Sequence, residues 1–262
     1  MPAPAPAARP SVLAYLDSTE AAYVRSFRAH VVALPPGGVV LDRTFFYPEG
    51  GGQPADTGEI TTGDGGSVPV VGALRSGPQV LHRLGRPGPR TAPLRIGSEI
   101  TGTVAWPRRY AHMRAHTAQH LLSALLFRRS GRRTRSARLS AAAGTVQLEP
   151  EGSILPEPEE IAAEFGSWVE RSVPVSVRFV ARSEFDREPG GRSGLRPLPA
   201  SVDPVRIVEI AGVDRCPCGG THLRSTSEIG PVTVQYGARD PTGGTRVTFV
   251  LAPDPATPTR SG

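Results

Sequence analysis

The chain has 262 residues, a formal net charge of +6 and two cysteines. This length is enough for one large domain or two modest ones, and two cysteines one residue apart exclude the disulfide framework of a small secreted protein. No apolar run approaches the roughly 18 residues of a membrane span, and the first ten residues lack the apolar core of a signal peptide. We therefore expect a cytoplasmic protein that makes no membrane contact.

The excess of positive charge favours a polyanionic partner such as a nucleic acid, bound through phosphate contacts. All 30 basic residues are arginine, and alanine, glycine and proline are abundant. A biased coding composition is therefore an alternative explanation, in which the arginines form only a solvated surface.

The first part of the chain is rich in short β-type runs. Residues 1–11 are Pro/Ala-rich and predict a disordered tail. Between about 25 and 105, Gly, Pro and Asp separate the runs HVVAL, GGVVLDRTFF, SVPVVGAL, QVLHRL and SEITGTVAW. This spacing predicts a small β-barrel domain over residues 12–106, with a sandwich as the alternative.

The pattern changes at Pro107. Residues 108–129 contain no Gly or Pro and predict a helix, and residues 157–172 predict a second, amphipathic helix followed by a strand over 173–180. A loop is expected from about 184 to 204, and then the strands VRIVEI, PVTVQY and TRVTFVL, the last two joined through DPTGG. We expect an α+β protein in which a two-layer α/β domain occupies residues 107–252 and a disordered tail occupies 253–262.

Two pairs of side chains have metal-ligand spacing. His116 and His120 are four residues apart on the predicted helix, so their side chains leave the same face. Cys218 and His222 are also four residues apart, across Gly219 and Gly220, where the backbone can turn tightly around an ion. Three imidazoles and one thiolate form a good ligand set for one Zn²⁺ per chain.

Each pair has an alternative explanation. Two histidines at helical spacing arise by chance, CGG is also a common tight turn, and an inert core cysteine would account for Cys218. A protease is disfavoured, because the H-E-x-x-H motif places a general-base Glu between its histidines, whereas here the intervening residues are Thr117, Ala118 and Gln119.

These motifs resemble those of a known family. The segments HMRAHTAQHLLSALL and DRCPCGGTHL are similar to the H-x-x-x-H and C-x-x-x-H zinc motifs of the alanyl-tRNA editing family, AlaX. LDRTFFYPEGGGQPADTG (41–58) resembles the glycine-rich segment of the longer AlaX proteins and of alanyl-tRNA synthetase, and RIVEIAGVD and STSEIGPV also match. The resemblance covers roughly residues 18–250, but residues 133–149 follow the family's usual strand only loosely.

The resemblance implies roles for two groups of residues. His116, His120, Cys218 and His222 would be the zinc ligands. Gly50, Gly51, Gly52 and Gln53 would form a loop beside the aminoacyl group, although the residues alone favour a plain strand turn. No catalytic side chain is implied, and a zinc-associated water and a zinc-positioned substrate both stay open.

The resemblance also implies an activity: ATP-independent hydrolysis, in trans, of tRNA(Ala) that carries serine, with glycine as an alternative. An aminoacyl ester is already activated, so positioning would supply most of the catalysis. Two other classes stay open, a non-catalytic zinc-stabilised RNA-binding module and a metal-dependent hydrolase of small acylated molecules. The oligomeric state and the tRNA identity elements are not predicted.

Overall fold

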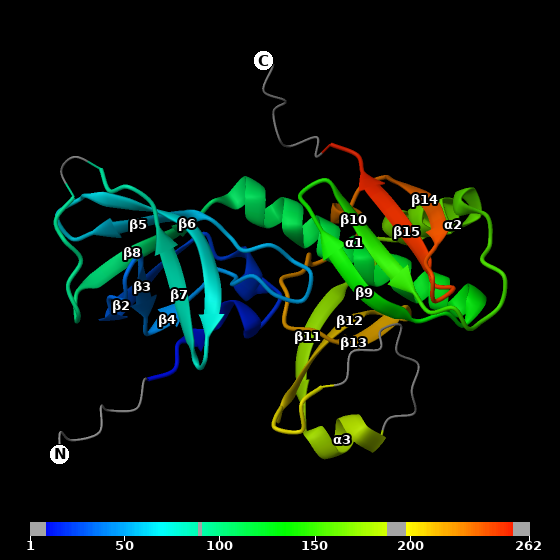
Figure 1. The fold of residues 1–262 in the computed structure, drawn as a ribbon, viewed down its shortest axis with the longest axis horizontal. Helices are drawn as coiled ribbons and strands as arrows, with labels where there is room; N and C mark the ends of the chain where they lie inside the picture. Colours follow the sequence, from blue (N-terminus) through cyan, green and yellow to red (C-terminus); the bar gives the residue numbers. More distant parts are fainter. Residues whose placement is uncertain (1–8, 89–90, 188–197, 254–262) are drawn as a thin grey trace. The chain divides into compact units, whose positions relative to one another are not determined.

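The computed structural model describes residues 9–88, 91–187 and 198–253 (Figure 1). Within them the protein is strand-rich with three α-helices, which confirms the α+β class. The chain divides into two compact units. Of the described residues, the first contains 9–17, 21–50 and 54–109, and the second contains 18–20, 51–53 and those from Tyr110 onward.

The first unit contains a closed barrel in the order β2-β3-β7-β6-β5-β8. Its strands are β2 (Ser26–Ala33), β3 (Gly38–Leu41), β5 (Gly58–Thr62), β6 (Ser67–Ser76), β7 (Gln79–Leu84) and β8 (Glu99–Val104). Two short strands, β1 (Val12–Leu13) and β4 (Arg43–Thr44), pair in parallel beside two 3-10 turns, Ala14–Leu16 and Glu20–Tyr23. Five of the six barrel strands overlap the predicted runs, whereas β5 was not predicted.

Alternation of side chains builds the barrel core. In β2, Phe27, Ala29 and Val31 are buried while the residues between them are exposed. This period of two places one side of each strand inside the barrel. Other strands add Val39, Leu41, Ile60, Val70, Val80 and Ile100 to the same cluster.

A buried ion pair also stabilises this unit. Arg109 is fully buried and its guanidinium binds the Asp56 carboxylate, while its remaining donors bind the carbonyls of Ala22 and Phe45. Asp56 also accepts a hydrogen bond from the Tyr47 amide at 2.6 Å. The pair is therefore surrounded by hydrogen bonds, which offset the cost of burying two charges.

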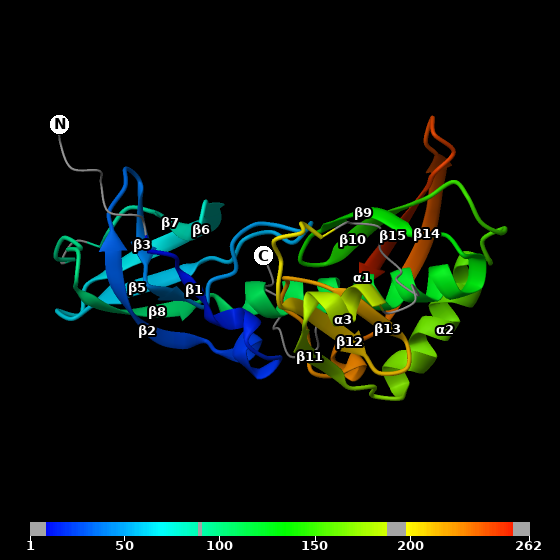
Figure 2. The same cartoon turned by 90° about the horizontal axis from the view of Figure 1, so that it is seen from below.

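The second unit is built around α1 (Trp106–Ser130), which begins in the first unit. One sheet has the order β14-β15-β10-β9, and its strands are β9 (Thr134–Leu139), β10 (Ala143–Leu148), β14 (Val232–Arg239) and β15 (Thr245–Leu251). The other has the order β11-β12-β13, with β11 (Val175–Val180), β12 (Val205–Ile210) and β13 (Asp214–Pro217). Figures 1 and 2 show α1 between the two sheets, so a second sheet adds to the two layers expected.

Every residue of α1 from His112 to Leu126 is buried except Gln119. A helix buried on nearly all sides is a central helix, not a surface one. Its polar side chains therefore reach protein partners on both sides. Two examples are Arg114, which donates to the Ile229 carbonyl at 2.7 Å, and Ser123, which accepts from the Thr134 hydroxyl at 2.8 Å.

The other predicted elements of this unit are confirmed with small shifts. The second helix, α2, covers Pro158–Glu170 and packs on β14, and the strand after it is β11. The loop expected from about 184 is wrong at its start, because α3 covers Arg182–Arg187. Phe185 anchors this turn by packing with Val180, Val205 and Ile207.

Several predictions lie outside what the structure describes. The loop prediction falls partly on residues 188–197, and the two predicted tails fall mostly on residues 1–8 and 254–262. The predicted domain boundaries stay predictions. Among the described residues, no helix is both long enough and apolar enough to cross a membrane.

Candidate metal centre

The first half of the site lies on the central helix. His116 and His120 are separated by one turn of α1, and their ring centroids are 5.1 Å apart. Both are buried, as are nearly all residues around them on the helix. The helix therefore holds two imidazoles side by side in a site that excludes most water.

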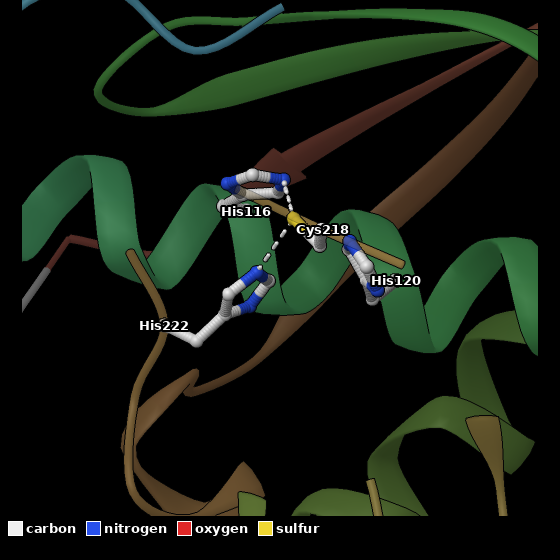
Figure 3. A group of neighbouring side chains, drawn as sticks. All are labelled: His116, His120, Cys218 and His222. Carbon is white, nitrogen blue, oxygen red and sulfur yellow. Dashed lines mark hydrogen bonds between the residues drawn. The ribbon is translucent and has the colours of Figure 1, made fainter. Parts of the chain in front are cut away.

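The second half follows β13. The Cys218 amide donates to the Arg206 carbonyl at 3.2 Å, which fixes the start of the turn beside β12. From there the Cys218 sulfur lies 3.5 Å from His116 Nε2 and 3.3 Å from His222 Nε2 (Figure 3). One ligand atom from each of His116, His120, Cys218 and His222 lies within 4.8 Å of the others.

Each imidazole is oriented by a hydrogen bond from its Nδ1 atom. His116 Nδ1 lies 2.7 Å from the side-chain oxygen of Gln53, and His120 Nδ1 lies 3.1 Å from an Asp214 carboxylate oxygen. His222 Nδ1 lies 3.3 Å from the Thr117 hydroxyl. With a proton on each Nδ1 atom, the three Nε2 atoms keep lone pairs for a metal, the arrangement usual for histidine ligands.

The electrostatics of the cluster favour a cation. Burial alone would raise the pKa of the Cys218 thiol, but the imidazoles of His116, His222 and His120 lower it well below 9, which gives a thiolate. Burial lowers the pKa of His120, yet Cys218 and Asp214 outweigh it and raise this pKa to about 10, so without a metal ion this ring holds a second proton, which a bound ion would replace. Burial and His116 lower the pKa of His222, which keeps its imidazole neutral.

The structure does not support the role expected for the two glycines, which was to let the backbone turn tightly. Neither Gly219 nor Gly220 has a positive φ, so the turn needs no left-handed backbone at these positions. Instead, a Cβ at Gly220 would lie 2.1 Å from the His116 ring, whereas a Cβ at Gly219 would touch nothing within 4 Å. Gly220 is therefore needed for the close approach of backbone to imidazole.

The glycine-rich loop reaches the same cluster through its last residue. Gly51 and Gly52 have φ of 60° and 88°, and the Gly52 carbonyl accepts from the Leu139 amide of β9 at 2.9 Å. Gln53 is buried, and its amide nitrogen donates to the Thr221 hydroxyl at 2.9 Å while its oxygen faces His116. The predicted contact of Gly50, Gly51, Gly52 and Gln53 with an aminoacyl group stays a prediction.

Sequence reasoning missed the roles of Asp214 and Thr117. Asp214 is buried at the start of β13, 94 positions from its partner His120. The other cysteine, Cys216, lies near His120 and Asp214 but is not in the group of four. The available signal was this acidic residue four positions before Cys218.

The four donors fit a zinc ion. With Zn–N bonds of about 2.0–2.1 Å and Zn–S bonds of about 2.3 Å, tetrahedral geometry separates an N ligand from an S ligand by roughly 3.5 Å. The two distances from the Cys218 sulfur to Nε2 atoms are 3.5 and 3.3 Å. A thiolate and three imidazoles, all held from outside the cluster, are the donor set that Zn²⁺ prefers.

Two family models match parts of the chain. Residues 205–248 match the threonyl and alanyl tRNA synthetase second additional domain, and residues 14–108 match the class II (A) tRNA synthetases. The first match includes Cys218 and His222, and the second includes the barrel and Gln53.

The chain is also similar to named proteins of archaea. It is 33% identical to the alanyl-tRNA editing protein AlaX-M of Methanosarcina mazei over 81% of this chain and 86% of that protein. It is 29% identical to AlaX-M of Saccharolobus solfataricus over 88% of this chain and 96% of that protein. It is 37% identical to the alanine–tRNA ligase of Pyrobaculum calidifontis, but the match spans only 26% of that ligase.

Proposed function

The chain belongs to the alanyl-tRNA editing proteins, the AlaX family, and we propose that it hydrolyses the ester of mischarged tRNA(Ala). The proposed substrate is seryl-tRNA(Ala), with glycyl-tRNA(Ala) as a second substrate, and the enzyme spares alanyl-tRNA(Ala). Four proposed ligands, His116, His120, Cys218 and His222, hold one Zn²⁺. The observation that carries the proposal is their convergence from α1 and from the turn after β13, with an outer hydrogen bond on every imidazole.

When bound by these four residues, Zn²⁺ would supply a Lewis acid to the site. The chain supplies orientation. Gln53, Asp214 and Thr117 fix the three imidazole rings, and burial of the cluster strengthens its electrostatic interactions with a substrate. Because an aminoacyl ester is already activated, holding it in one orientation supplies much of the rate enhancement.

The direct test is a deacylation assay with seryl-, glycyl- and alanyl-tRNA(Ala). We expect release of serine, slower release of glycine and little release of alanine, and we expect loss of activity when a chelator removes the metal. A protein that contains stoichiometric zinc and binds tRNA but hydrolyses none of the three would be an RNA-binding module. Hydrolysis of small acyl esters but not of aminoacyl-tRNA would indicate a general esterase.

A further inference from the structure

Positive charge is segregated on one sheet of the second unit. The described strands β9, β10, β14 and β15 contain Arg135, Arg138, Arg239 and Arg246 but no Asp, Glu or Lys. Several arginines elsewhere in this unit are paired with carboxylates, as Arg178 is with Glu209 and Arg224 is with Glu20. A sheet that keeps its arginines away from carboxylates leaves their charge available for an external anion.

The strand register places two of these arginines on the same face. Arg138 pairs with Thr145, which pairs with Thr248, and Arg246 is two residues from Thr248 on β15. Paired residues, and residues two apart on one strand, point to the same side of a sheet. Arg138 and Arg246 are both exposed, and neither forms an ion pair with a described residue.

The rest of the same face is mostly polar and neutral, and Ala143 and the exposed Val250 are apolar positions on it. Alternate residues, including Val146, Val247 and Phe249, point the other way and are buried in the core that contains α1. The outward positions between and beside the arginines are half-buried or exposed side chains with hydroxyl or amide groups: Ser136, Thr145, Gln147, Thr233, Gln235 and Thr248. Hydroxyls, amides and guanidinium groups are the side chains that contact phosphate and ribose.

Carboxylates occur only at one end of this face among the described residues. Asp240 lies in the turn between β14 and β15, where it accepts hydrogen bonds from Thr242 and Gln147, and Glu149 follows β10. The opposite end leads to the metal centre, because the Leu139 amide at the end of β9 binds the glycine loop that carries Gln53.

We propose that the outer face of the β14-β15-β10-β9 sheet binds the sugar–phosphate backbone of the substrate RNA, with Arg138 and Arg246 contacting phosphates (Figure 1). The contacts are independent of base sequence, because the face offers donors for phosphate and ribose. The proposal rests on the proposed function, because it requires that the substrate of this protein is a tRNA. It goes beyond that function by assigning the RNA to one sheet and to two residues.

The test compares two variants of equal net charge. The double variant Arg138→Gln/Arg246→Gln removes the proposed contacts, and Arg178→Gln/Arg224→Gln removes two exposed arginines that are paired elsewhere in the same unit. Binding of uncharged tRNA(Ala) transcript is measured between about 50 and 200 mM salt, together with zinc content, thermal unfolding and seryl-tRNA(Ala) deacylation.

We expect the first variant to lose about 10-fold or more in affinity at low salt, and its slope of log affinity against log salt to fall by about 1.4 to 1.8. The control should keep the wild-type slope, and both variants should keep zinc and thermal stability. If both variants lost the same tRNA affinity, or if neither lost any while the wild type binds and deacylates tRNA, the assignment of this face would be overturned but the proposed function would not. A wild-type protein that neither binds nor deacylates tRNA would overturn the proposed function as well.

Discussion

A carboxylate oxygen of Asp214 lies 3.1 Å from Nδ1 of His120, and both side chains are buried. The carboxylate holds the ring so that Nε2 faces the cluster. It also places a second negative charge beside the Cys218 thiolate, which favours a dication. Asp214 would thus act on a bound metal ion through His120.

Replacing Asp214 by Ala should therefore weaken zinc binding by about 10- to 100-fold, the usual effect of losing such a partner. Zinc affinity is measured by competition with a chromophoric chelator. Glu209→Gln is the matched control, because this carboxylate lies on the neighbouring strand β12 and pairs with Arg178. Unchanged affinity in Asp214→Ala would show that the pair does not orient a metal ligand.

Gln53, the last residue of the glycine loop, has two candidate roles: it orients His116 through their hydrogen bond, or it contacts the substrate. Gln53→Met keeps the length of the side chain but removes its acceptor, whereas Gln53→Glu keeps an acceptor. If Gln53 orients His116, the Met variant should lose about 10-fold or more in zinc affinity and the Glu variant should retain it. A Met variant with normal zinc affinity but a raised KM for seryl-tRNA(Ala) would instead assign Gln53 to the substrate.

Gly219 and Gly220 should respond differently to the same substitution. Gly220→Ala places a methyl group 2.1 Å from the His116 ring and should displace that ligand, whereas Gly219→Ala meets no atom within 4 Å. We expect a loss of zinc affinity of at least about 10-fold in the first variant and little change in the second, which isothermal titration can measure. Similar zinc affinities in the two variants would mean that the His116 ring can move aside without weakening zinc binding.

His82 should make the stability of the protein depend on pH. Burial lowers its pKa to about 4, and the neutral ring is held by the Thr44 hydroxyl at 2.8 Å and the Val39 carbonyl at 3.1 Å. The unfolded chain takes up the proton near pH 6.5. The contribution of His82 to the free energy of unfolding is therefore fully present above pH 6.5. It decreases as the pH falls toward 4, by up to about 1.4 kcal/mol per pH unit.

Denaturant unfolding of His82→Gln between pH 4 and 7 checks this expectation, because glutamine can make both hydrogen bonds without titrating. The variant should show a flatter dependence of the unfolding free energy on pH than the wild type. A wild-type slope in His82→Gln would mean that other groups cause the pH dependence.

Local patterns were enough to predict the elements that carry the ligands. The helix expected over 108–129 is α1, and the two pairs at spacing four both reach the cluster. Their spacing follows from helix geometry and from a short turn, which sequence displays directly. The zinc assignment itself stays a prediction.

The partners of the ligands could not be predicted, because they depend on long-range contacts. Gln53 is 63 positions from His116, and Asp214 is 94 from His120. No periodicity connects such residues before the sheets and α1 are assembled. The same limit explains why the role expected for Gly220 was wrong. The ring that leaves no space for a Cβ at this position is that of His116, which belongs to α1.

The rate of seryl-tRNA(Ala) deacylation in the two cysteine variants tests the central claim most directly. Cys218 faces two Nε2 atoms of the cluster, whereas Cys216 lies outside the group of four and is only near His120 and Asp214. Losing the thiolate of Cys218 removes charge and a soft donor from the metal. We predict that Cys218→Ala loses zinc and nearly all deacylation while Cys216→Ala keeps both, and equal rates in the two variants or the reverse ranking would contradict the account.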